Sequence, residues 1–194
     1  MASSPIDSLS QRVVYITFCH SIDEKQACFL MQLCSEIVSK EHPDILYLIL
    51  SSTGGSVDYG ITLYNFLRAL PCILVTHNIG TIESIANIVF LAGEQRLAAK
   101  RARFLLHGIF WHPAASTIIA NAQISELRSR FCDDEDNIKS IIMERTALKE
   151  DQIRDFFLTG ESRSPEFAKE VGIISSIDEL KIQRGRTLII SNPA

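Results

Sequence analysis

The sequence lacks the features of a membrane or secreted protein. None of its apolar runs reaches the about 18 consecutive residues that read as a membrane-spanning helix. The N-terminal stretch Met1-Ala2-Ser3-Ser4-Pro5 has no basic region followed by an apolar segment, so no secretory signal is expected. We therefore expect a cytoplasmic protein that makes no membrane contacts.

An excess of positive charge is also missing. The chain has 19 Lys and Arg residues against 23 Asp and Glu residues, which gives a formal net charge of −4. This balance argues against nucleic acid as a partner, because binding to phosphates needs clustered cations. The acidic run 133–136 lies inside a helical pattern and is predicted to be a solvated helix face, with a docking patch as the alternative.

The cysteines are too few, and too irregularly spaced, for a disulfide framework or a metal site. We expect no metal and no cofactor, and we predict buried, reduced thiols because each cysteine lies within an apolar run. A nucleophilic cysteine stays open as an alternative, although none stands at an element junction beside a histidine-bearing strand. The five residues are Cys19, Cys28, Cys34, Cys72 and Cys132.

Repeats, linkers and low-complexity tracts are absent from the sequence as well. With 194 residues, of which 46% are hydrophobic, the chain can form one sizeable core, and we predict a single domain over residues 1–194. Short apolar runs alternate with longer segments of helical periodicity, the pattern of parallel strands joined by crossover helices. Strands are predicted at 13–18, 45–50, 72–76, 96–98 and 103–106, and helices at 23–39, 58–70, 84–92, 117–146, 150–157 and 165–171.

A serine, a histidine and a pair of glycines stand at the ends of these predicted elements. Ser84 opens a helix after a strand and an exposed turn, and His107 ends the next apolar strand. Neighbouring elements can therefore bring the hydroxyl and the imidazole together, which is the minimum for acyl transfer by a histidine-activated serine. Gly54 and Gly55 follow the buried strand 45–50, where bare N–H groups can face an oxyanion. Each feature also has a structural explanation: a helix cap, a core histidine and a tight turn.

Phosphate binding is a further use of a glycine-rich turn. The phosphate-loop pattern needs a lysine before a serine or threonine, and the dinucleotide pattern needs a third spaced glycine. The segment Ser51–Val57 has neither. Acyl transfer is therefore the better interpretation of this turn.

Several runs resemble the Clp-type serine peptidases, the proteolytic subunits of Clp protease. They are 48–57, 80–93, 103–107 and 164–174, and the resemblance extends from about Arg12 to Ile177. It implies an α/β fold of repeated β-β-α and βαβ units of the Clp/crotonase type, with a long helix after the catalytic histidine strand. The implied activity is that of a serine endopeptidase.

The resemblance also assigns roles to the site residues. Ser84 is the implied nucleophile and His107 the implied general base. The oxyanion hole is implied to consist of the N–H groups of Gly55, with Gly54 as a further candidate, and of Ile85, the residue after the nucleophile.

The third member of the triad departs from the family pattern. A gapless match places the family's catalytic aspartate at Gly160. We therefore predict that Glu161, the adjacent acid, orients His107, with Asp155 as the alternative and Glu83 as a weaker one.

The resemblance implies peptide or unfolded-protein substrates and a homo-oligomeric ring, with stacking through the long helix 117–146. An AAA+ unfoldase partner is doubtful, because only about a dozen residues precede the first strand and the family's N-terminal pore loops look missing. The apolar residues 109–111 suit a subunit contact or a substrate subsite. Two alternatives stay open: a crotonase-type acyl-CoA enzyme, and a ring or scaffold subunit with impaired catalysis.

Overall fold

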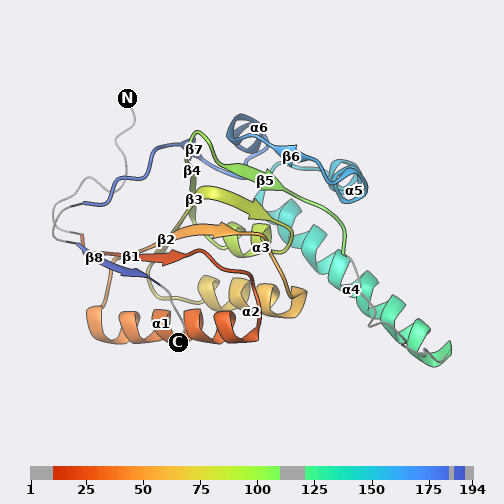
Figure 1. Cartoon of the computed structure of the whole chain (residues 1–194), viewed down its shortest axis with the longest axis horizontal. Coiled ribbons are helices and arrows are strands. Elements are labelled where there is room, and N and C mark those ends of the chain that lie inside the picture. Colours follow the sequence, from red (N-terminus) through yellow and green to blue (C-terminus); the bar gives the residue numbers. More distant parts are fainter. Residues whose placement is uncertain (1–10, 110–120, 184–185, 191–194) are drawn as a thin grey trace.

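The computed structural model describes residues 11–109, 121–183 and 186–190. An eight-stranded sheet has the order β6-β5-β3-β2-β1-β8, and β4 and β7 branch from β3 (Figure 1). The elements are β1 (Val13–Phe18), α1 (Glu24–Glu41), β2 (Ile45–Ser52), α2 (Val57–Arg68), β3 (Ile73–Glu83), α3 (Ala86–Leu91), β4 (Gln95–Ala98), β5 (Arg103–Leu105), α4 (Asn121–Arg145), α5 (Glu150–Thr159), β6 (Ser162–Arg163), α6 (Pro165–Glu170), β7 (Ser176–Ile177) and β8 (Thr187–Ile190).

The first three strands confirm the two predicted crossover units. β1 pairs with β2 and β2 with β3, both in parallel, and α1 and α2 form the connections. β2 lies in the middle of the sheet, and all but one of its residues are buried. This explains why its sequence is a continuous apolar run rather than an alternating one.

The two faces of the sheet pack against two different apolar clusters. Side chains such as Ile16 and Leu48 point into the main core with α1, α2 and α3, whereas their neighbours Tyr15 and Tyr47 point into a smaller apolar cluster on the opposite face. Leu180, from the segment that follows β7, packs against that second cluster. Figure 1 shows α1 and α2 side by side along one side of the sheet.

The exposed turn predicted between strand 72–76 and Ser84 is wrong, because β3 continues as a strand to Glu83. Its polar residues misled the prediction. His77 and Asn78 are fully buried, and their side chains bond within the fold: Asn78 donates to the Arg103 carbonyl, and His77 contacts the Tyr47 hydroxyl and the Asp178 carbonyl. Polar residues can lie in a buried strand when their hydrogen bonds are satisfied.

The long helix after the histidine strand is present as α4, although its predicted start at 117 lies outside the described residues. Only Ile138 and Ile142 are buried, both in its C-terminal half. Ile124, in its N-terminal half, is 54% exposed. Figure 1 shows the N-terminal half of α4 projecting away from the sheet. The described part of this chain therefore leaves that half of α4 largely uncovered.

The prediction that all cysteines are buried is wrong. Only Cys34 is buried, and its burial in the core raises the pKa of the thiol to about 12. Cys19, Cys28 and Cys132 are exposed, and Cys72 is partly buried. An apolar run on an amphipathic helix still has a solvent side, and Cys28 lies on that side of α1.

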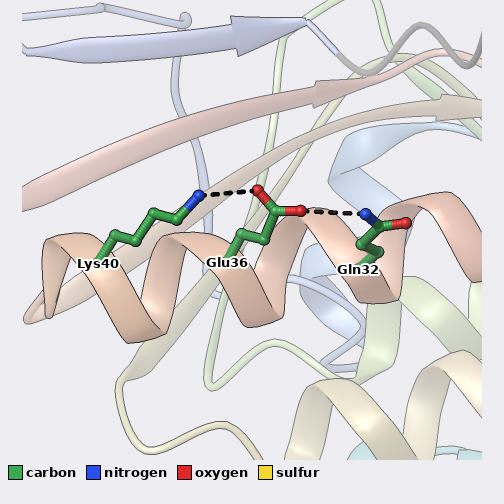
Figure 2. A network of polar contacts seen from close by, with 3 residues as sticks. All are labelled: Gln32, Glu36 and Lys40. Carbon is green, nitrogen blue, oxygen red and sulfur yellow. Dashed lines mark hydrogen bonds and ion pairs between the residues drawn. The ribbon is translucent and has the colours of Figure 1, made fainter.

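The solvent face of α1 carries a chain of polar contacts one helical turn apart. Gln32 Nε2 donates to Glu36 at 3.0 Å, and Lys40 Nζ donates to the other carboxylate oxygen at 3.2 Å (Figure 2). The hydrogen bond from Gln32, followed by that from Lys40, lowers the pKa of Glu36. Residues four apart lie on one helix face, so this network marks the outer face of α1.

In the described part of the chain, no helix has the length and apolar content needed to span a bilayer.

Candidate active site

The turn after β2 brings its backbone against the end of β3. Gly54 has a φ of 87°, and a Cβ at this position would lie 2.7 Å from Ser84 Cβ and 2.8 Å from the Glu83 carbonyl oxygen. Real Cβ atoms are not found that close to other atoms. Only glycine therefore allows this turn to approach the predicted nucleophile.

Ser84 stands between β3 and α3 rather than inside the helix. Its φ of 55° is left-handed, an unusual conformation for a residue with a side chain. Its N–H donates to the Leu105 carbonyl at 2.9 Å, which ties the turn to β5. Backbone in sparsely populated conformations is common at functional sites, where the surrounding structure holds it in place. The position is a sharp strand-to-helix turn, the arrangement that exposes a nucleophile at the end of a sheet.

Asn87 holds this turn together, and sequence reasoning missed it. The side chain is 3% exposed, and its Nδ2 donates to the Ser84 carbonyl at 3.0 Å and to the Leu105 carbonyl at 2.9 Å. The Asn87 amide therefore connects the turn at Ser84 to the end of β5. A lone amide within the otherwise apolar run 85–92 was the signal that could have found it.

His107 reaches the same place from β5. β3 and β5 are parallel, with Glu83 opposite Leu105, so Ser84 and His107 follow directly after paired residues. Both line a cavity of about 250 Å³. Its walls come from α2, α3, α4 and α5, from the turn after β2 and from the segment that follows β5. The apolar lining residues are Val57, Ile85, Ile88, Leu106, Ile109, Ile138, Ile142 and Phe157, and Thr53, Gly55, Asn87 and Gly108 take the remaining positions.

The predicted oxyanion donors fall into two groups. The Gly54 N–H already donates to Ser52 Oγ at 3.2 Å, so this amide supports the turn. For the N–H groups of Gly55 and Ile85, no acceptor is found among the described residues. Both residues line the cavity beside Ser84. The backbone thus has two N–H groups at this cavity without an acceptor among the described residues, and the oxyanion hole stays a prediction.

The predicted acids lie away from the histidine ring. Glu161 Oε2 is 2.8 Å from Arg163 NH2, and the Glu161 side chain is 58% exposed. The Arg163 guanidinium in turn lies over the rings of Phe156 and Phe167, at 4.9 and 5.2 Å from their centroids. Asp155 is exposed on α5. The described contacts bring neither carboxylate to His107, and the predicted third member stays a prediction.

Position 160 itself faces the histidine. β6 pairs antiparallel with β5, with Leu105 opposite Ser162, and extending this register places His107 opposite Gly160. A Cβ on Gly160 would lie 3.7 Å from His107 Cβ, and within 4 Å it would meet no other atom of the described residues. Glu161, the next residue, has its carboxylate paired with Arg163. Among the residues that the structure describes, no group of three or more His, Cys, Asp or Glu side chains could hold a metal ion.

Comparisons with known proteins identify the family of this chain. The profile of the Clp protease family matches residues 4–181. The chain belongs to the Clp protease family. It is 26% identical over 181 residues to the ATP-dependent Clp protease proteolytic subunit 2 of Corynebacterium diphtheriae, a match covering 88% of this chain and 84% of that protein. The similarity to the proteolytic subunit of Oltmannsiellopsis viridis is 25% over 177 residues, covering 86% of this chain and 84% of that protein.

A solved structure confirms the predicted Clp/crotonase-type fold. A mutant of ClpP1 from Listeria monocytogenes superposes with a TM-score of 0.73 over 88% of this chain and 92% of that one, at 21% identity. Together with the family match, this confirms the resemblance read from the sequence. The chain is thus a Clp-type serine peptidase, and a crotonase-type acyl-CoA enzyme is not favoured.

Proposed function

We propose that this peptidase cleaves peptide bonds through an acyl-enzyme on Ser84, with His107 as general base and then general acid. The observation that carries the proposal is the common cavity: the strained Ser84, the imidazole and the two backbone donors all line it. Nucleophile, base and oxyanion donors around one cavity are the minimum that acyl transfer needs.

In the first step, Ser84 Oγ attacks the substrate carbonyl carbon while its proton passes to His107 Nε2. The carbonyl π electrons move to oxygen, and the oxyanion accepts hydrogen bonds from Gly55 and Ile85. Collapse of this intermediate breaks the C–N bond, and His107 returns the proton to the leaving amine. Water then repeats the sequence on the acyl-enzyme and releases the acid product. Each oxyanion donor is worth about 3–4 kcal/mol of transition-state stabilisation in a peptidase of this kind.

The lining of the cavity favours an apolar side chain next to the scissile bond. Ile138 and Ile142 of α4 and Phe157 of α5 form part of its wall, and all three side chains are apolar. Burying a leucine-sized side chain there contributes about 1.5–3 kcal/mol to binding. We therefore propose peptides with an aliphatic residue on the acyl side of the cleaved bond as substrates.

Labelling with a fluorophosphonate tests the nucleophile. Ser84→Ala should abolish both labelling and cleavage of short peptides, and His107→Ala should slow both by several orders of magnitude. Ser56→Ala is the matched control, because this nearby serine makes no side-chain cap bond at the start of α2. Equal cleavage by Ser84→Ala and the parent would refute the assignment. An unlabelled parent chain would favour the impaired-subunit alternative.

We also propose that the chain assembles into a homo-oligomer. Its relatives are named as subunits, and Ile124 in the projecting half of α4 is an exposed apolar side chain. Light scattering of the purified protein tests this, and a monomer at micromolar concentration would contradict it. The same relatives are named as ATP-dependent, so cleavage should be measured with and without an ATPase partner. Cleavage of short peptides without ATP stays our prediction.

A further inference from the structure

We infer that the backbone carbonyl of Gly108, and not a carboxylate, positions the imidazole of His107. The inference rests on the proposed function and concerns how its base is oriented. His107 Nδ1 lies 2.7 Å from the Gly108 carbonyl oxygen. A carbonyl oxygen can only accept, so Nδ1 carries the proton of the neutral ring. Nε2 is then the unprotonated nitrogen, the one that must take the proton from Ser84.

The residue that carries this carbonyl is hydrogen-bonded to α5. The Gly108 N–H donates to the Phe157 carbonyl at 3.1 Å, which ties the peptide between His107 and Gly108 to that helix. A Cβ on Gly108 would lie 3.2 Å from that same oxygen and 3.9 Å from Glu135 Oε1. Glu135 Oε2 lies 4.0 Å from Lys139 Nζ on the same helix, α4. The orienting carbonyl therefore follows directly after a peptide that is anchored to α5.

The carboxylates of the neighbouring elements are used otherwise. Glu161 pairs with Arg163, Asp155 is exposed on α5, and Glu83 accepts the Thr81 hydroxyl at 2.7 Å. The place opposite His107 belongs to Gly160, which has no side chain to offer. Among the contacts of the described residues, the partner of His107 Nδ1 is thus the backbone carbonyl of Gly108.

This arrangement predicts a gain of activity from one added carboxylate. Gly160 ends α5 with φ 60° and ψ 40°, a left-handed conformation that Asp and Asn tolerate better than other residues. The Cβ of an aspartate there would lie 3.7 Å from His107 Cβ and within 4 Å of no other atom of the described residues, so its carboxylate has room beside the histidine. A charged acceptor stabilises the imidazolium of the transition state more than a neutral one does. Gly160→Asp should therefore raise kcat/KM by about tenfold, the ratio expected when a charge-assisted bond is added.

Gly160→Asn is the matched control, because it has the same shape and backbone demand without the charge. The acid limb of the rate profile should move to higher pH in Gly160→Asp only, since a carboxylate favours the protonated imidazole. Equal rates and equal profiles for the two variants would show that position 160 does not reach the ring, and the inference would fail.

Two further measurements decide the inference independently of the engineered gain. Glu161→Gln and Asp155→Asn should each label and cleave within about threefold of the parent, whereas loss of 100-fold or more in either would assign the role to that acid. Nitrogen-15 NMR of His107 in the full chain should show the Nδ1–H tautomer, and the Nε2–H tautomer would overturn the inference. A parent that carries the Nδ1–H tautomer but does not label would refute the proposed function alone.

Discussion

Replacing Gly54 by alanine should separate the geometry of the site from the stability of the fold. The added Cβ would start 2.7 Å from Ser84 Cβ and 2.8 Å from the Glu83 carbonyl oxygen, about 1 Å closer than ordinary contact. Either Ser84 or the turn must therefore shift by roughly that distance. A displacement of about 1 Å at a reacting group can lower the rate about 100-fold. We expect a loss of at least that size in the rate of phosphonate labelling.

Part of the stability loss expected for Gly54→Ala comes from backbone strain rather than from the close contact of the added Cβ. The φ of 87° adds about 1–2 kcal/mol for a residue with a side chain, which lowers Tm by roughly 2–8 °C for a chain of this length. Gly172→Ala controls for this effect. Its φ of 74° is similarly unfavourable, but its Cβ would meet no atom closer than 3.5 Å, the backbone nitrogen of Ala147 at the far end of α4.

Labelling rate and thermal unfolding should be measured on both alanine variants. Similar Tm losses, with the labelling rate reduced only in Gly54→Ala, would support the close approach of the glycine turn to the nucleophile. A Gly54→Ala variant that labels as fast as Gly172→Ala would refute the reasoning, because the turn would then tolerate a side chain beside Ser84.

Two other predictions concern buried polar side chains. Asn87→Leu should lower the free energy of unfolding by about 1–3 kcal/mol and reduce kcat, because the Ser84 and Leu105 carbonyls each lose one of two hydrogen-bond donors. An unchanged denaturation midpoint with unchanged kcat would contradict the structural role of Asn87. Burial lowers the pKa of His77 in the folded chain. As the pH falls, the imidazole is therefore protonated first in the unfolded chain. The free energy of unfolding should drop below about pH 6.5, by at most about 1.4 kcal/mol per pH unit. Urea titrations between pH 5 and 8 should show a weaker acid-side loss in His77→Gln; an equal loss would assign the effect to other groups.

The elements themselves followed from local patterns. The apolar run of β2, the helical spacing of α1 and the proline at the start of α6 are each short-range features, and the structure has all three elements close to their predicted bounds. Ser84 and His107 were also proposed from local patterns, because both stand where an apolar element ends; the structure places both at one cavity. The error in β3 had a physical cause. Burial of His77 and Asn78 depends on partners 101 and 25 residues away, which no local pattern contains.

Only the tertiary structure decided what surrounds the predicted pair Ser84 and His107. The sequence placed Glu161 next to the matched position 160, yet the fold brings Arg163 within 2.8 Å of the Glu161 carboxylate. The contact between Gly160 and His107 depends on the pairing of β6 with β5, and the support that Asn87 gives to Ser84 depends on β5 lying beside β3. Residue identity thus determined which groups are present, whereas strand register determined which of them meet.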